Sequence, residues 1–434
     1  MPMIGYLTKI QFDHGALALL PEECASSLLF PPLRVSSGMT GGWDRRLELL
    51  GASKPLVVTD PGIVASGLLD QLLGALGDLP HAVFDETLSN PTEEGVLAAL
   101  AIYKEQGCDS VVGFGGGSSI DLGKAVRLLS THAPPLVSYA MAEGGVERIT
   151  ADMPPLVAIP TTAGTGSEVG RGSVVVMADG RKLGLISPHL MPSVAICDPD
   201  LTLGLPPSLT AATGLDAMSH CMETCKCRGP LSSSSDVLTT RCWTDLSPAI
   251  NPPADAIALD GLRRAAAHLE TATNDGSNKE ARWNMMMAAM EGAMAFQKGL
   301  GAVHAMSHPL GALEELRLHH GTLNAVVTPA VLEFNKDSVG DKHAVLADAL
   351  GLPPGADLIE AVADLNERLG MPASLAEMGV KPEWFRELSE QAVGDHCNGT
   401  NPREAGVEDY IALFEAASKP YVKAGAAATA SARL

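Results

Sequence analysis

The segment Ser110-Val111-Val112-Gly113-Phe114-Gly115-Gly116-Gly117-Ser118 decides the fold class of the first half of the chain. Residues 110–114 form an apolar run of the strand type, and helical spacing follows over about residues 118–129. A buried strand that passes through glycines into a helix is the beginning of a βα unit, and such units build parallel sheets. We therefore expect a parallel sheet in the first half.

The pattern on both sides of this segment supports that prediction. Further strands are expected at residues 54–60, 82–85, 156–159, 173–177 and 194–198, and a helix at 92–106 with Thr92 as its N-cap. Because the strands are continuously apolar, the sheet should be covered on both faces. After about residue 200 the pattern becomes almost wholly helical, with helices expected at 208 onward, 253–269, 279–300, 322–335, 343–350, 358–369, 384–393 and 408–417. The sequence thus predicts an α/β domain over residues 1–200 and an all-helical domain over 201–434.

Composition limits the classes of partner. The chain has 434 residues, of which 46% are apolar and 19% charged, so it can bury a large core. A net charge of −21 argues against nucleic-acid or anionic-membrane partners. No apolar run reaches membrane-spanning length, the residues from Met1 to Tyr6 do not resemble a secretory signal, and eight cysteines then suggest free thiols. We expect a cytoplasmic protein without a membrane partner.

Two loops at strand ends are candidates for binding a dinucleotide. Gly115, Gly116, Gly117 and Ser118 lie where a helix N-terminus could hold a pyrophosphate, although a tight turn without a ligand is the alternative. The second loop, residues 160–168, is rich in glycine and threonine, and its alternative is a helix-capping loop. Asp60 ends an earlier strand, where its charge would favour NAD over NADP; otherwise it is a turn residue before Pro61.

The stretch Gly214-Leu215-Asp216-Ala217-Met218-Ser219-His220 suggests a metal site. Asp216 and His220 are four residues apart, so in a helix both side chains lie on one face. An isolated pair of this kind is more often structural. Here a second group of imidazoles follows downstream, and its members are His304, His308, His319 and His320.

Taken together, these segments resemble the iron-containing, or group III, alcohol dehydrogenase family. The segments that match are residues 57–60, 90–92, 115–118 with Asp121 and Lys124, 159–168, 214–220, and 303–321 followed by Asn324. The resemblance implies a dinucleotide-binding α/β domain followed by a helical metal-binding domain, the dehydroquinate synthase-like arrangement.

The resemblance also implies roles for individual residues. Asp216, His220, His304 and His320 would bind one divalent metal, with His319 as the alternative to His320. His308 would lie near the nicotinamide, and Lys182 would lie near the cofactor. The residues expected to line the cofactor are Asp60, Asn90, Gly115, Gly116, Gly117, Ser118, Asp121, Thr161, Thr162 and Thr165.

The implied chemistry is hydride transfer between NAD and a small alcohol or aldehyde. One carboxylate and three imidazoles suit either Fe²⁺ or Zn²⁺, and the family favours Fe²⁺. Such a metal polarises the substrate oxygen as a Lewis acid. Family members are commonly homodimers or larger homo-oligomers, so we expect an oligomer here.

Two segments depart from the family pattern, at about residues 24–46 and 225–247, and we expect poorly packed insertions there. The second brings Cys225, Cys227 and Cys242 close to Cys221 in sequence, but their spacing is not that of a standard zinc knuckle. Three alternative functions remain: a dehydroquinate synthase-like enzyme, which would need a basic substrate site; a maleylacetate reductase-like enzyme, which would lack the metal ligands; and an inactive nucleotide-binding homologue.

Overall fold

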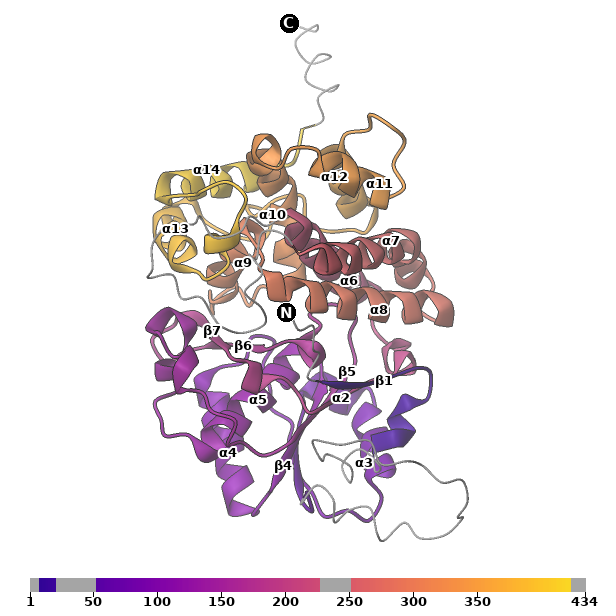
Figure 1. Cartoon of the computed structure of the whole chain (residues 1–434), viewed down its shortest axis with the longest axis vertical. Helices are drawn as coiled ribbons and strands as arrows, with labels where there is room; N and C mark the ends of the chain where they lie inside the picture. The colour runs from indigo at the N-terminus through magenta and orange to yellow at the C-terminus, as the bar shows by residue number, and fades with distance from the viewer. Residues whose placement is uncertain (1–7, 21–51, 227–250, 423–434) are drawn as a thin grey trace, which may run out of the picture.

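The computed structural model describes residues 8–20, 52–226 and 251–422. It divides into two layers of different architecture, with a sheet and its helices below and a group of helices above (Figure 1). The expected insertion at 24–46 lies outside the described residues, and so does the expected insertion at 225–247 apart from the end of a helix at Cys225 and Lys226.

The lower layer is a six-stranded sheet in the order β1-β8-β5-β4-β2-β3, and every neighbouring pair of strands is parallel. This arrangement confirms the predicted fold class. The strands are β1 (Lys9–Phe12), β2 (Pro55–Val58), β3 (Ala82–Phe84), β4 (Ser110–Gly115), β5 (Leu156–Pro160) and β8 (Val194–Cys197).

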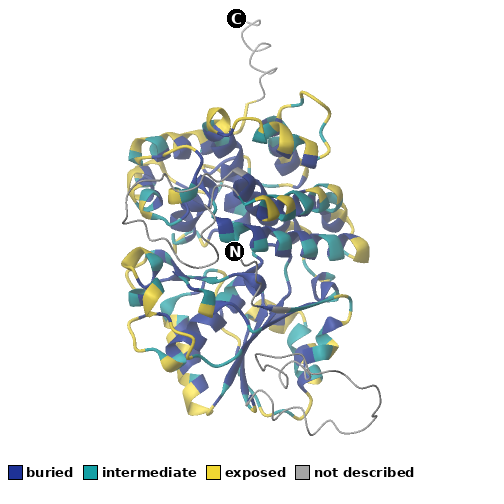
Figure 2. Ribbon diagram, viewed as in Figure 1, coloured by how far each residue is buried: buried dark blue, intermediate teal, exposed yellow. Residues whose placement is uncertain are grey.

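Helices cover both faces of this sheet because alternate strand residues point in opposite directions. Leu56 and Val111 belong to the core under α4 (Glu93–Glu105) and α5 (Gly117–Thr131). Val57 and Val112 face α2 (Pro61–Ala65) and α3 (Leu68–Leu76) instead. The strands are therefore buried on both sides, as Figure 2 shows for the dark-blue centre of the lower layer.

One predicted strand is not part of this sheet. The apolar run at 173–177 forms β6 (Gly172–Val176), which pairs antiparallel with β7 (Lys182–Ile186) in a separate two-stranded ribbon. Local apolarity predicted the strand correctly, but it carries no information about which strand will be its partner. The ribbon lies on the side of the sheet layer that faces the helices (Figure 1).

The upper layer is built from helices. Its helices are α6 (Pro207–Lys226), α7 (Pro252–Asn274), α8 (Lys279–Ala295), α9 (Ala302–Gly311), α10 (His320–Asn335), α11 (Lys342–Ala349), α12 (Leu358–Arg368), α13 (Phe385–Gly394) and α14 (Val407–Ala417). The parallel sheet ends at Cys197 and α6 begins at Pro207; the predicted domain limits of 1–200 and 201–434 fall between them and stay a prediction. Among the described residues, every helix is too short or too polar to cross a bilayer.

Buried Lys124 fixes the shape of the loop between β5 and β6. Its ammonium is fully buried and donates to the carbonyl oxygens of Ser167, Gly170 and Gly172 at 2.6–3.0 Å. It also lies 3.8 Å from Asp121 Oδ1. One buried cation thus satisfies acceptors along the loop that follows the Gly- and Thr-rich residues 160–166.

We expect the substitution Lys124→Met to destabilise the protein by about 3–5 kcal/mol, since it leaves the partly buried Asp121 carboxylate without its cation and three carbonyl oxygens without their donor. Urea unfolding of both proteins would measure this as a lower midpoint with an unchanged slope. Lys104→Met on the exposed face of α4 is the matched control and should change stability little. Equal midpoints for Lys124→Met and the control would show that the hydrogen bonds of Lys124 to the loop do not stabilise the fold.

Candidate functional site

Three helices bring the predicted metal ligands together. Helix α6 carries Asp216 and His220, α9 carries His304, and α10 begins at His320. The Nε2 atoms of the three imidazoles lie 3.7, 3.8 and 3.8 Å from Asp216 Oδ1. One ligand atom from each of Asp216, His220 and His304 lies within 4.8 Å of the other two, and His320 Nε2 adjoins this group at Asp216. Residue spacing alone had indicated Asp216 and His220, and the family resemblance had added His304 and His320.

The surroundings of Asn324 test whether these atoms suit a metal ion. Asn324 Nδ2 donates to Asp216 Oδ1 at 2.7 Å and lies 3.2 Å from Nε2 of both His304 and His320. One amide has two hydrogens for these three acceptors, and its own Oδ1 is buried without a hydrogen-bond partner. The acceptor atoms outnumber the amide hydrogens. One carboxylate oxygen and three imidazole nitrogens are also the ligand atoms that suit a cation of the Fe²⁺ or Zn²⁺ type.

Burial keeps two of the three imidazoles neutral, the form in which histidine binds metals. Desolvation lowers the pKa of His220 to about 4 and places the pKa of His320 well below its ordinary value. Burial also opposes charge on His304, but the hydrogen bond and charge of Glu223 outweigh it and raise the pKa of that imidazole.

Glu223 supports His304 from behind. Its Oε2 accepts from His304 Nδ1 at 2.6 Å, which leaves Nε2 free to face the cluster, and its Oε1 accepts from the Val303 backbone N–H at 2.8 Å. Asn401 accepts from the neighbouring Ala302 N–H at 3.0 Å. Since Gly301 offers no side chain, these two residues serve as the cap of α9.

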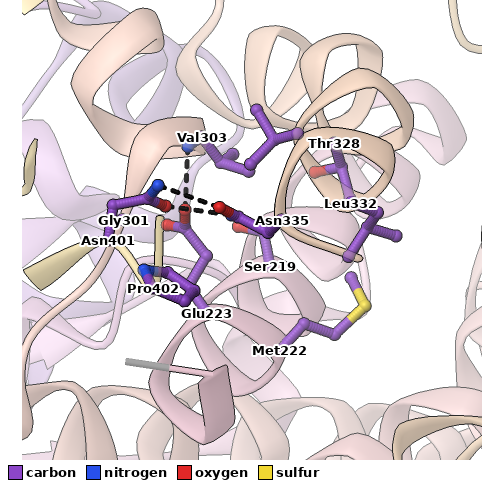
Figure 3. Close-up of a pocket in the computed structure, with 11 residues that line it drawn as sticks. Ser219, Met222, Glu223, Gly301, Val303, Thr328, Leu332, Asn335, Asn401 and Pro402 are labelled. Carbon is purple, nitrogen blue, oxygen red and sulfur yellow. Dashed lines mark hydrogen bonds between the residues drawn. The ribbon is translucent and has the colours of Figure 1, made fainter. Parts of the chain in front are cut away.

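Figure 3 shows the small pocket behind this cap, with Glu223 directed at Val303 and with Asn335 and Asn401 exchanging amide hydrogen bonds. Its volume of about 10 Å³ has room for a single water molecule and none for a substrate. We therefore assign it to the support of His304 and place any substrate elsewhere.

Glu223→Gln is expected to weaken metal binding about 10- to 100-fold, the usual effect of removing the carboxylate behind a metal-bound imidazole. A glutamine offers one acceptor oxygen where the carboxylate offers two, so either His304 or Val303 loses its partner. Competition against a chromophoric chelator measures the affinity. Glu333→Gln on the exposed surface of α10 is the control; equal affinity in both variants would exclude this role for Glu223.

His308 and Lys182, the two candidate catalytic residues predicted to lie near the cofactor, are both close to His320 of the cluster. His308, one turn after His304 on α9, is buried, and its Nδ1 lies 2.8 Å from Asp395 Oδ2. Lys182 on β7 is also buried and donates to Asn90 Oδ1 at 2.7 Å. Desolvation lowers the pKa of Lys182 to about 8.

A pocket of about 740 Å³ reaches this region between β7, α9 and α13. Lys182 and Asp395 are among its lining residues, and so are Glu387 and Glu390 of α13. Asn90, which accepts from Lys182, also donates to the carbonyl oxygen of Leu318, just before α10, at 3.3 Å. The strand ribbon, the sheet layer and the helical layer thus meet at one site.

The two adjacent histidines before Gly321 have different surroundings. His320 directs Nε2 toward Asp216 and Asn324, as described above. His319 is the N-cap of α10, and its side chain accepts from the Thr322 backbone N–H at 3.4 Å. The His320 imidazole thus lies among the other predicted ligands, and its choice over His319, made from its position beside glycine, stays a prediction.

The glycine run packs closely against the first turn of α5 and against the second loop. A Cβ at Gly115 would lie 2.6 Å from Ser119 Oγ, and one at Gly117 would lie 2.5 Å from Thr165. Gly115 also has a φ of 146°, which few residues other than glycine adopt. Gly116 is the N-cap of the 15-residue helix α5, so the first N–H groups of that helix, which have no acceptor within the helix, lie at the glycine run.

The remaining predicted cofactor residues occupy different positions around this loop. Asp60 caps α2 through the N–H groups of Gly62 and Ile63, and its second oxygen accepts from Ser119. Asp121 accepts from Ser167 Oγ and from the Val174 N–H, below the loop. The others lie at the loop itself: Ser118 donates to the Ser89 carbonyl oxygen, Thr161 donates its N–H to Gly115, Thr162 is half-buried, and Thr165 accepts from the Ser167 N–H.

Two supporting residues were not predicted from the sequence. Glu223 continues the helical face of Asp216 and His220 by one further turn, so its spacing could have identified it. Asp395 is 87 residues from His308, and no local pattern connects them.

A glycine loop at a helix N-terminus, together with a cluster of one carboxylate and three imidazoles, is typical of an enzyme that uses a dinucleotide and a metal ion. Comparison with known families gives the specific assignment. The model described as iron-containing alcohol dehydrogenase matches residues 34–199, and the one described as the C-terminal part of the Fe-containing alcohol dehydrogenase family matches residues 233–418. The chain belongs to the iron-containing alcohol dehydrogenase family.

Individual relatives agree with this assignment. A 4-hydroxybutyrate dehydrogenase of Cupriavidus necator is 50% identical over 96% of this chain and 99% of its own length. The crystal structure of a 1,3-propanediol oxidoreductase has a TM-score of 0.80 at 33% identity, covering 96% of this chain and all of that one. A sulfoacetaldehyde reductase from Bifidobacterium kashiwanohense, solved with NAD⁺, has a TM-score of 0.76 at 25% identity, with 96% and 99% covered. The chain is a metal-dependent alcohol dehydrogenase or aldehyde reductase that uses NAD(H).

Proposed function

We propose that this enzyme interconverts a short ω-hydroxy acid and its aldehyde with NAD, using one Fe²⁺ ion. The observation that carries the proposal is the cluster of Asp216, His220, His304 and His320 beside buried Lys182, across from the glycine loop. In this proposal residues 1–200 bind the cofactor and residues 201–434 bind the metal.

The four clustered side chains would hold the ion through one carboxylate oxygen and three imidazole nitrogens. When bound, the ion supplies Lewis-acid stabilisation of the substrate oxygen. Glu223 keeps His304 in the tautomer whose Nε2 faces inward. Iron is proposed over zinc from the family alone, since the ligand types suit both.

The glycine loop would hold the pyrophosphate of NAD at the N-terminus of α5, where unpaired N–H groups and the helix dipole favour an anion. Asp60 adds a negative charge at the end of β2, and this charge disfavours the 2′-phosphate of NADP. Thr161, Thr162 and Thr165 of the second loop, which packs against the glycine run, would contribute further contacts to the cofactor. His308, oriented by Asp395, would lie beside the nicotinamide and carry the hydroxyl proton away.

The substrate class is inferred from the relative in Cupriavidus necator together with Lys182. An ω-hydroxy acid has an alcohol at one end and a carboxylate at the other, and the Lys182 ammonium is available beside the cluster for the negative end. The balanced reaction is 4-hydroxybutyrate plus NAD⁺ to 4-oxobutyrate, NADH and a proton. We further propose a cytoplasmic homodimer or larger homo-oligomer, as expected from the family resemblance.

The proposal is tested by steady-state kinetics of the iron-loaded enzyme with 4-hydroxybutyrate and with 1,3-propanediol. We expect a higher kcat/KM with the hydroxy acid, and a loss of this preference in Lys182→Met. A preference for the diol would refute the substrate class but leave the metal- and NAD-dependent reaction standing. No NAD⁺ reduction with any alcohol would instead favour the inactive homologue.

A further inference from the structure

A second group of potential metal ligands lies beside His308. The turn that follows α13 presents Asp395, His396 and Cys397 in succession, and α9 presents His308. One ligand atom from each of these four side chains lies within 4.8 Å of the other three. None of the three residues in the turn belongs to the cluster around Asp216.

The side chains of this group are in close contact with one another. His308 Nδ1 is 2.8 Å from Asp395 Oδ2, His396 Nδ1 is 3.6 Å from Asp395 Oδ1, and His396 Nε2 is 3.4 Å from Cys397 Sγ. In a tetrahedral zinc site, neighbouring ligand atoms are roughly 3.3–3.8 Å apart, given bonds of about 2.0–2.3 Å. These contacts involve both nitrogens of His396 and both oxygens of Asp395, whereas an ion would take one ligand atom from each side chain. Side-chain rotations would have to reduce the present separations of up to 4.8 Å between those four atoms to this spacing.

The turn itself is held firmly. Asp395 Oδ1 accepts from the Cys397 N–H at 2.8 Å, and Thr400 Oγ1 donates to the Leu300 carbonyl oxygen ahead of α9. The imidazole of His396 stacks on that of His308 with ring centroids 5.6 Å apart. A Cβ added to Gly184 in β7 would lie only 3.2 Å from Cε1 of His396, so this imidazole packs directly against the strand. The group therefore sits where the helical layer meets the strand ribbon.

We propose that His308, Asp395, His396 and Cys397 form a second, inhibitory binding site for Zn²⁺ or a similar thiophilic divalent cation. Two nitrogens, one carboxylate oxygen and one sulfur are a donor set that favours Zn²⁺ over Mg²⁺ or Ca²⁺. When the ion binds His308 through Nδ1, the single N–H proton of that neutral imidazole moves to Nε2, and the hydrogen bond to Asp395 is replaced by the two bonds to the metal. The thiol proton of Cys397 is released to solvent. Because His308 then coordinates the ion, it can no longer carry away the hydroxyl proton, which is the role that the proposed function gives it.

Cobalt(II) is the probe, since a cobalt–thiolate bond gives a near-ultraviolet charge-transfer band that nitrogen and oxygen ligands do not give. The protein is first loaded at its Asp216 site and then titrated with Co²⁺. We expect the thiolate band to appear with one further equivalent, and Zn²⁺ to abolish it. This readout does not depend on alcohol turnover, so it is independent of the proposed substrate.

Three variants make the assignment specific. Cys397→Ser should remove the band, His396→Ala should weaken cobalt binding by more than about tenfold, and the buried-thiol control Cys108→Ser should retain both. The Zn²⁺ concentration for half-inhibition should rise by a similar factor in the first two. The absence of a thiolate band in the wild type, or its persistence in Cys397→Ser, would overturn the site and leave a hydrogen-bonded network alone. If Cys397→Ser does not fold, His396→Ala decides, since unchanged affinity there refutes the site.

Discussion

Asp216→Ala is expected to release the bound metal and lower kcat/KM for alcohol oxidation by about 10³-fold or more. Asp216 is the only anion among the four clustered side chains, and its Oδ1 is within 3.8 Å of all three imidazole nitrogens. Without the Lewis acid, the activation free energy rises by several kcal/mol, and each 1.4 kcal/mol lowers the rate about tenfold. Metal analysis of the purified variant and NAD⁺ reduction kinetics measure the two effects.

Asp348→Ala is the matched control, because Asp348 lies on the exposed face of α11. It should keep one metal per chain and the rate of the wild type. Circular dichroism of Asp216→Ala separates loss of the ion from loss of the fold. A folded Asp216→Ala enzyme with a full complement of metal and unchanged kcat/KM would show that the cluster is not the metal site.

Gly117→Ala is expected to weaken NAD⁺ binding about 5- to 150-fold without releasing the metal. The added Cβ would lie 2.5 Å from Thr165, closer than side chains tolerate, so the two cofactor loops must separate. Overpacking of this kind costs about 1–3 kcal/mol, which gives the stated range of affinities if the strain falls on the loop. Titration with NADH, followed by its fluorescence, measures the dissociation constant.

Gly74→Ala controls for the change of residue type, because a Cβ on Gly74 of α3 would meet nothing within 4 Å. That variant should bind NADH as the wild type does. Metal content distinguishes damage to the cofactor loop from damage to the metal site, and in Gly117→Ala it should stay at one ion per chain. Unchanged NADH affinity in Gly117→Ala would mean that the glycine run is a turn and does not bind the cofactor.

The elements with strong local patterns were predictable from the sequence. The apolar strands around residues 55–58, 110–115 and 156–160 and the long amphipathic helices lie within a few residues of their expected positions. β1 and β7 were missed, since a short edge strand and a half-buried ribbon lack a continuous apolar run. α9 was missed as an element because Gly301 gives it no side-chain cap and Pro309 interrupts its pattern.

Site residues were predictable where helical spacing brings them together. Asp216 with His220, and His304 with His308, are each four residues apart, and that spacing survives in the structure as shared helix faces. The contact of Asp395 with His308 joins residues that are 87 apart in the sequence, and the contact of Lys182 with Asn90 joins residues that are 92 apart. Such contacts depend on how distant segments pack, and no local periodicity predicts them. The same limit explains why the antiparallel partner of β6 was not predicted.

The central claim is that Asp216, His220, His304 and His320 hold the ion that alcohol oxidation requires. A crystal structure of the iron-loaded enzyme, with anomalous scattering data collected above the iron edge, tests it most directly. We predict one strong anomalous peak within bonding distance of Asp216 Oδ1 and the three Nε2 atoms. An active crystal preparation whose peak lies elsewhere, or which has no peak at this point, would contradict the claim.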